Sequence, residues 1–168
     1  MLATLALFIF PVLMAYAASS DLLTMRIANW LVILVALAYL GLALLLGIPW
    51  EQIGWAAVAA VAVLVVAFAF FAFGWIGGGD AKLVSATALW VGTNVMLQYL
   101  IYAALLGGAL TLIILAFRRY PMPAWLLRHQ WIDRLHDTKS GVPYGIALAL
   151  AAILVYPDTA IFTALISS

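Results

Sequence analysis

Residues 74–83, GWIGGGDAKL, separate two long apolar segments with a run of three glycines. One apolar segment, at about residues 52–73, ends where this stretch begins, and another starts at about residue 81. Asp80 therefore places a carboxylate at the edge of an apolar segment, where a charge is costly unless it is paired, hydrated or functional. The stretch predicts a break between two helices and marks Asp80 as a candidate functional residue.

The composition on both sides of this stretch is typical of a membrane protein. Of the 168 residues, 69% are hydrophobic and 8% are charged, and the mean hydropathy is +1.24. A soluble domain is nearer half apolar and a quarter charged, so most of this surface is expected to face lipid. The sequence has no cysteine, which excludes disulfides, thiolate catalysis and cysteine-based metal sites. No basic patch interleaved with aromatic residues is present, so no nucleic-acid partner is expected.

Six apolar segments of helical length cover the chain. They lie at about residues 2–20, 27–47, 52–73, 81–97, 99–117 and from about 142 to the C-terminus. The fourth and fifth segments meet at Gln98, and the sixth is expected to kink or end at Pro157. Backbone groups in lipid must be satisfied internally, and the segments lack the alternation of barrel strands. We predict an all-α membrane protein with a single domain over residues 1–168, built as a bundle of six transmembrane helices.

The basic residues predict how these helices are oriented. If successive connections alternate across the bilayer, all seven fall on one side: Arg26, Lys82, Arg118, Arg119, Arg128, Arg134 and Lys139. The other side holds Glu51 and Asp158, and the positive-inside bias makes the basic side cytoplasmic. We therefore expect a multi-pass protein of the inner (cytoplasmic) membrane with both termini outside. No Lys or Arg precedes Arg26, so the first segment is interpreted as a retained span and not as a signal peptide.

The connection from Arg118 to Gly141 is predicted to contain an interfacial amphipathic helix. A helix starting at Ala124 gathers apolar side chains on one arc: Ala124, Trp125, Leu127, Trp131, Ile132 and Leu135. Polar side chains point the other way: His129, Gln130, Asp133, His136 and Asp137. Such a helix lies in the headgroup layer, in contact with membrane lipid.

Some of these polar residues have a spacing that can bind a metal: His129, Asp133, His136 and Asp137. A solvated face of the amphipathic helix explains the same pattern, and we prefer that interpretation. We therefore expect no metal site and no cofactor, and a membrane metallohydrolase is kept only as a minor alternative.

Asp21, in the stretch SSDL at residues 19–22, ends the first apolar segment much as Asp80 begins the fourth. Each aspartate alone is explained as a helix cap or an interfacial residue. Both are expected at the cytoplasmic face, however, and two neighbouring carboxylates hold one proton between them near neutral pH. The ionised member can take a proton from water while the protonated member polarises a carbonyl group. The two aspartates are therefore predicted to form a catalytic pair.

The motifs around the two aspartates resemble those of the prepilin peptidases, which are GxGD-type intramembrane aspartyl proteases. The second motif is matched at Gly77, Gly79, Asp80, Lys82 and Leu83. The first is matched at Asp21, Leu22, Ile27 and Asn29, whereas Ala28 stands where the family usually has proline. The resemblance implies that Asp21 and Asp80 are catalytic, and we expect the substrate to be bound by Gly77, Gly78, Gly79 and Lys82.

The same resemblance implies a substrate class. Its members are type IV prepilins, cleaved on the cytoplasmic side after a glycine that precedes a hydrophobic helix. Only five residues separate Asp21 from Ile27, so the chain lacks the cysteine-containing cytoplasmic insertion of the long-form family. It looks like the short form associated with Flp/Tad-type pili.

Two other functions fit the same residues. The first is a small ion- or proton-coupled carrier, in which the paired aspartates bind cations beside a glycine-interrupted helix. Against it, both aspartates map to one membrane face, whereas coupling sites usually lie near the midplane. The second is a non-enzymatic membrane subunit, in which both aspartates would tolerate replacement by asparagine.

Overall fold

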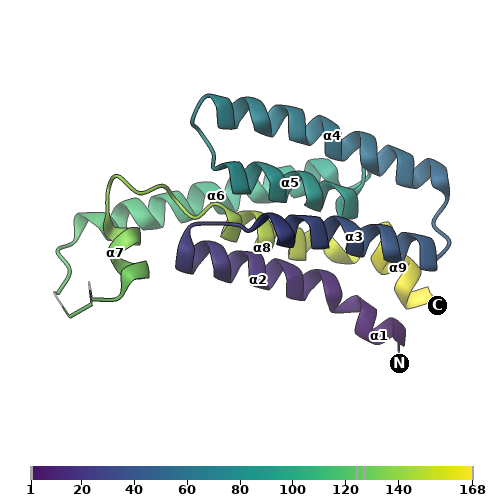
Figure 1. The fold of residues 1–168 in the computed structure, drawn as a ribbon, viewed down its shortest axis with the longest axis horizontal. Coiled ribbons are helices and arrows are strands. Elements are labelled where there is room, and N and C mark those ends of the chain that lie inside the picture. The colour runs from purple at the N-terminus through teal and green to yellow at the C-terminus, as the bar shows by residue number, and fades with distance from the viewer. Residues whose placement is uncertain (1, 124, 127, 168) are drawn as a thin grey trace.

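The computed structural model describes residues 2–123, 125–126 and 128–167, and in that part of the chain all regular structure is helical (Figure 1). The all-α prediction is therefore confirmed. In chain order the elements are α1 (Leu2–Leu7), α2 (Ile9–Thr24), α3 (Asn29–Leu45), α4 (Trp50–Ala72), α5 (Gly78–Val91), α6 (Met96–Arg119), α7 (Gln130–His136), α8 (Gly145–Val155), the 3-10 turn η1 (Tyr156–Asp158) and α9 (Ala160–Ser167).

Several of these helices are suited to cross a membrane. By length and hydropathy, the described residues contain three candidate spans, Thr4–Thr24, Trp50–Ala72 and Met96–Arg119, and up to four if the bent pair α8 and α9 counts as one. Many of their large apolar side chains are exposed, including Val58, Val65, Phe68 and Leu112, and so large an apolar surface fits lipid better than water. The chain is thus a multi-pass membrane protein, and six spans remain a prediction.

The predicted junction between the fourth and fifth segments was misplaced. Gln98 lies inside α6, and the break comes earlier, because α5 ends at Val91 and Gly92 has a φ of +63°. Only glycine adopts that conformation without strain. At 14 residues, α5 is about 21 Å long, which is shorter than the hydrocarbon core of about 30 Å.

The predicted kink at Pro157 is confirmed. α8 ends at Val155, Pro157 lies in the 3-10 turn, and α9 continues at an angle of 46° to α8. The Thr159 hydroxyl donates to the Tyr156 carbonyl at 2.7 Å and thereby stabilises the bend.

The predicted interfacial helix is shorter than expected. It was expected to start at Ala124, which like Leu127 lies outside the described residues, whereas α7 starts at Gln130. Two successive turns precede it, because Leu126 donates to the Pro123 carbonyl and His129 to that of Leu126. Of the apolar side chains predicted to share one arc of this helix, Ile132 and Leu135 are buried on α7, whereas Trp131 is exposed.

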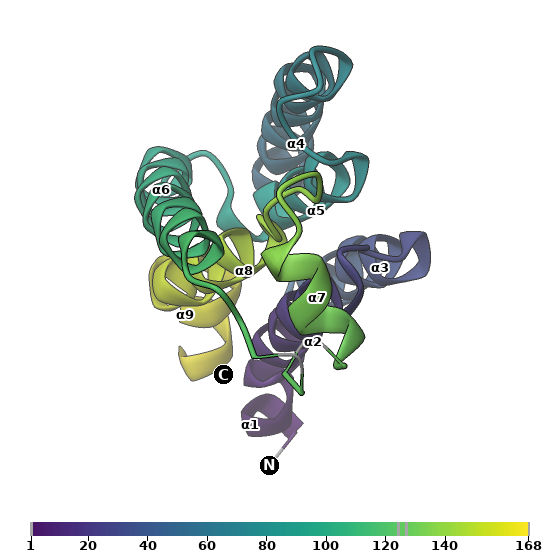
Figure 2. The same cartoon turned by 90° about the vertical axis from the view of Figure 1, so that its left-hand side faces the viewer.

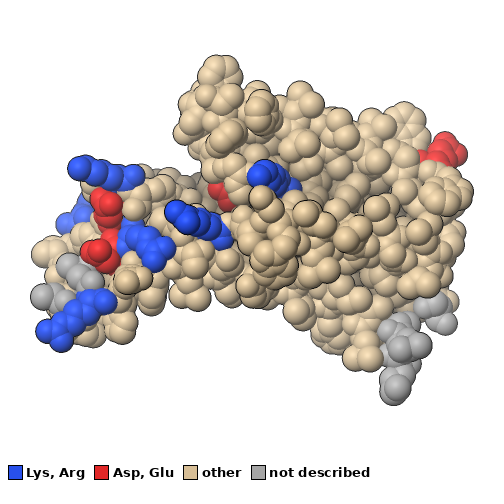
Figure 3. Space-filling view, viewed as in Figure 1, with Lys and Arg blue, Asp and Glu red and all other residues tan. Residues whose placement is uncertain are grey.

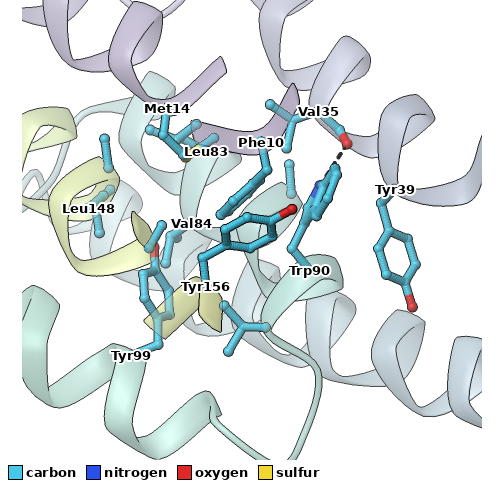
Figure 4. Packing of buried hydrophobic residues seen from close by; sticks show 14 of the residues in the cluster. Phe10, Met14, Val35, Tyr39, Leu83, Val84, Trp90, Tyr99, Leu148 and Tyr156 are labelled. Carbon is cyan, nitrogen blue, oxygen red and sulfur yellow. Dashed lines mark hydrogen bonds between the residues drawn. The ribbon is translucent and has the colours of Figure 1, made fainter. Parts of the chain in front are cut away.

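The bundle is organised around α5 and α8. α4 packs on α5, α6 packs on α8, and α8 also packs against both α2 and α5, as Figure 2 shows in a view along the bundle. At the end of the bundle that holds α9, the ring of Phe10 stacks on Trp90 at 4.5 Å, and the Trp90 indole donates to the Val35 carbonyl at 2.9 Å (Figure 4). This aromatic cluster fixes the C-terminal part of α5 against α2 and α3.

Basic side chains gather toward one end of the bundle, with acidic side chains among them (Figure 3). In Figure 3, Lys and Arg side chains gather around α7 and toward the middle of the molecule, and an acidic patch lies at the opposite end. Both termini lie at that opposite end (Figure 1). This arrangement agrees with the predicted sides of the basic residues.

Arg118 fastens the α6–α7 connection. Its Nε donates to the Leu135 carbonyl at 2.7 Å, and its Nη2 donates to the carbonyls of Ser140 and Gly141 at 3.0 and 2.9 Å. Arg119, next in sequence, is exposed. The two arginines thus offer a matched pair for testing the connection.

We expect Arg118→Gln to loosen residues 120–141, because three charge-assisted hydrogen bonds are lost. Limited chymotrypsin digestion of the purified protein should cut this connection at least about tenfold faster in Arg118→Gln than in the wild type. Arg119→Gln should be cut at the wild-type rate. Equal rates in the two variants would show that Arg118 does not hold the connection.

Candidate active site

The two predicted aspartates come together where α2 ends and α5 begins. Asp21 lies in the last turns of α2 and Asp80 in the first turn of α5. Asp21 is 4% exposed and Asp80 is 8% exposed, and they are the two charged residues that are buried in the described part of the chain. The carboxylates are close enough to interact electrostatically. The structure thus brings together the pair that sequence analysis assumed to be close.

A backbone N–H from a third helix joins the two carboxylates. Gly145, at the start of α8, donates to Asp21 Oδ2 at 2.7 Å, and the same N–H also interacts with the Asp80 carboxylate. The first N–H groups of a helix have no partner inside the helix and favour negative charge. α8 therefore supplies the polar group that makes the burial of the pair tolerable.

A side chain at position 145 would crowd Asp21 and Ile27. A Cβ atom added to Gly145 would lie 2.8 Å from Asp21 Oδ2 and 2.8 Å from Ile27 Cδ1. The close approach of α8 to the α2–α3 connection thus depends on this glycine. Sequence analysis did not single it out, although Pro143 and Gly145 mark the start of the last apolar segment.

The three glycines before Asp80 differ in their surroundings. Gly77 is extended, with φ −72° and ψ 147°, and its N–H interacts with the Asp80 carboxylate. Gly78 and Gly79 are already in the first turn of α5, where added Cβ atoms would lie 3.2 Å from the Phe71 ring and 3.1 Å from Ile27 Cβ. The last two glycines therefore allow close helix packing, and a role for all three in substrate binding stays a prediction.

Lys82 points away from the pair. It is exposed, and its Nζ donates to Asn29 Oδ1 at 2.9 Å. This bond joins the start of α5 to the start of α3, so the two sequence motifs are tied together. A contact between Lys82 and the substrate also stays a prediction.

Tyr144 is a second residue at the site that sequence analysis missed. It precedes Gly145 and lines, together with Asp80, a cavity of about 560 Å³. Its ring packs directly on Gly107 of α6. A Cβ atom added to Gly107 would therefore collide with the ring and hydroxyl of Tyr144. Asp80 and Tyr144 also interact electrostatically. The only signal in the sequence is the position of Tyr144 on the same predicted side as the aspartates.

Two of the four residues considered for a metal site make polar contacts with backbone groups in or beside the α6–α7 connection. His136 Nε2 lies 2.9 Å from the Tyr120 carbonyl oxygen, and Asp137 Oδ1 accepts from the Lys139 N–H at 2.9 Å. Among the described residues, no three His, Cys, Asp or Glu side chains are grouped closely enough to hold a metal ion. The metallohydrolase alternative therefore gains no support from the geometry.

We expect Gly145→Ala to destabilise the protein, because the added methyl group has to displace Asp21 and Ile27. Overpacking of this kind costs about 1–3 kcal/mol. Gly108→Ala is the matched control, since nothing lies within 4 Å of a Cβ atom at position 108 of α6, and it should stabilise by about 0.5–1 kcal/mol. Thermal unfolding in detergent measures both; an unchanged melting temperature for Gly145→Ala would mean that the contact is loose.

Comparison with known proteins relates the chain to a family of peptidases. The model of the type IV leader peptidase family matches residues 8–112, a range that includes Asp21, the glycine run and Asp80. No curated protein and no solved structure matches the chain significantly. Tyr144 and Gly145 lie beyond the matched range. Since the match covers more than half of the chain and both buried carboxylates, the chain belongs to the type IV leader peptidase family, the aspartic peptidases that remove leader peptides from prepilins.

Proposed function

We propose that Asp21 and Asp80 are the catalytic pair of this peptidase. The observation that carries the proposal is their joint burial beside the N–H of Gly145. Two carboxylates in such a place share one proton, so one is an acceptor while the other is a donor. Family membership also favours the peptidase over the carrier and the non-enzymatic subunit considered above.

The reaction needs only the pair, water and the prepilin. The ionised carboxylate takes a proton from water, and the resulting hydroxide attacks the carbonyl carbon of the scissile peptide bond. The protonated carboxylate donates its proton to the carbonyl oxygen, which gives a neutral tetrahedral intermediate. The intermediate then breaks its C–N bond: one proton passes to the leaving nitrogen, the hydroxyl proton returns to the pair, and the products are a carboxyl and an amino terminus.

The substrate class follows from the short connection between α2 and α3. Residues 25–28 link the two helices directly, with no room for the cytoplasmic insertion of long-form relatives. The proposed substrates are therefore Flp-like prepilins. Their scissile bond precedes a hydrophobic helix, which places it at the membrane surface beside the N-terminus of α5.

We expect Asp21→Asn and Asp80→Asn to abolish leader removal, a loss of at least about 100-fold. Each variant is co-expressed with a Flp-like prepilin, and the mass of the pilin is determined. Glu51→Gln is the matched control, because Glu51 is an exposed carboxylate in the first turn of α4, which begins at the end of the bundle opposite α7 (Figure 1), and it should process normally.

The asparagine variants should fold, since the asparagine side-chain oxygen can still accept from Gly145. They should be at least as stable as the wild type, because burying a charge is costly. Normal processing by either folded variant would remove that aspartate from the mechanism.

The proposed topology has six spans, both termini outside and the pair at the cytoplasmic face of the inner membrane. It is supported by the basic residues around α7, at the end of the bundle opposite the termini (Figures 1 and 3). α3 and α5 are short for spans, so neighbouring helices have to cover their ends.

The chain has no cysteine, so single cysteines report the topology without background. We expect Glu51→Cys to react with a membrane-impermeant maleimide in intact cells, because position 51 should face the outside. Lys139→Cys should react only after the cells are permeabilised. The reverse pattern would overturn the orientation, and labelling of both positions in intact cells would contradict an odd number of crossings between them.

A further inference from the structure

An apolar groove runs between α4 and α6 and ends at Asp80, one member of the proposed catalytic pair. α4 rests on α5 and α6 rests on α8, so the two outer helices stand apart above them (Figure 2). This arrangement leaves the cavity of about 560 Å³ that Asp80 and Tyr144 line. All its other lining residues are apolar, and they come from α4, α5, α6, α8 and the α4–α5 connection.

The groove has a direction. On α4 its lining extends from Ala62 to Phe70, a length of about 12 Å. On α6 it reaches Leu100, about 10 Å along the helix from Gly107, where Tyr144 lies. The groove therefore starts at Asp80 and Tyr144 and runs away from the basic end of the bundle, toward the end that holds both termini.

The walls of the groove suit a helix. Small side chains line both of its sides: Ala62 and Ala67 on α4, and Ala103 and Ala104 on α6. Small residues let helices approach closely in lipid, where packing and not the hydrophobic effect drives their association. A lipid chain would fill any apolar surface equally well, but it would have no reason to end at a buried carboxylate.

We propose that this groove seats the hydrophobic helix of the prepilin, the segment on the C-terminal side of the scissile bond. The inference rests on the proposed function, because it needs the bond to lie at Asp80. The substrate helix begins directly after that bond, as the groove begins directly after Asp80. About eight helical residues of the substrate fit along the 12 Å of lining. Recognition then comes from an apolar helix that leaves lipid sideways, between α4 and α6.

A bulky side chain in the groove should block the substrate. Ala104→Trp fills the groove from α6, and prepilin processing should fall at least about tenfold. Ala109→Trp is the matched control: it makes the same change on the same helix at an exposed position outside the lining, and it should process within about twofold of the wild type. Equal processing by the two variants would overturn the proposal.

Crosslinking tests the contact without relying on catalysis. A photoreactive amino acid replaces either Val66, which lines the groove, or Val61, which is equally exposed on another face of α4. In the Asp21→Asn background the prepilin stays uncleaved, and we expect crosslinks to its hydrophobic helix from position 66 and not from 61. Crosslinks from 61 alone, or none from either, would overturn the groove.

The two proposals fail in different ways. If Asp21→Asn still cleaves but position 66 crosslinks, the catalytic pair is wrong and the groove stands. If both asparagine variants are inactive but position 66 gives no crosslink, the pair stands and the groove is wrong.

Discussion

The bond from the Gly145 N–H to Asp21 Oδ2 holds the site together. α2 carries one carboxylate and α5 the other, and α8 packs against both. Its first N–H reaches both aspartates, so a buried pair of acidic groups is stabilised by a backbone dipole with no cationic side chain. The absence of a side chain at position 145 is as important as the N–H itself, because a methyl group would push Asp21 away.

The two sequence motifs of the family also fasten helices. Gly79 lets α5 lie against Ile27, and Lys82 donates to Asn29. Both contacts join the start of α5 to the α2–α3 connection, so the residues that surround the aspartates in sequence also fix the distance between them in space. A substitution at these positions is therefore expected to change the geometry of the pair, even where the residue itself touches no substrate.

Hydropathy and charge in the sequence reveal part of the fold and of the candidate site. The apolar segments are visible as runs of hydrophobic residues. The kink at Pro157 and the two isolated carboxylates are visible because these residues are unusual in or beside such runs. The end of α5 was misplaced because Gln98 was taken as the break, whereas the chain turns at Gly92, which has a positive φ and is followed by the polar Thr93 and Asn94. α7 was placed too early because turns at Pro123 and Leu126 precede it. Tyr144 and Gly145 were missed because their importance lies in tertiary contacts that no local pattern encodes.

The position of Gly145 has a consequence for how the enzyme is made. Synthesis delivers Asp21 first and Asp80 next, and the N–H that both carboxylates share comes only with α8. Until that hydrophobic segment is inserted and packed, the two acidic groups lack the N–H that they share. The shared donor is therefore the last part of the site to arrive, and the polar surroundings of the pair are complete only once α8 has packed.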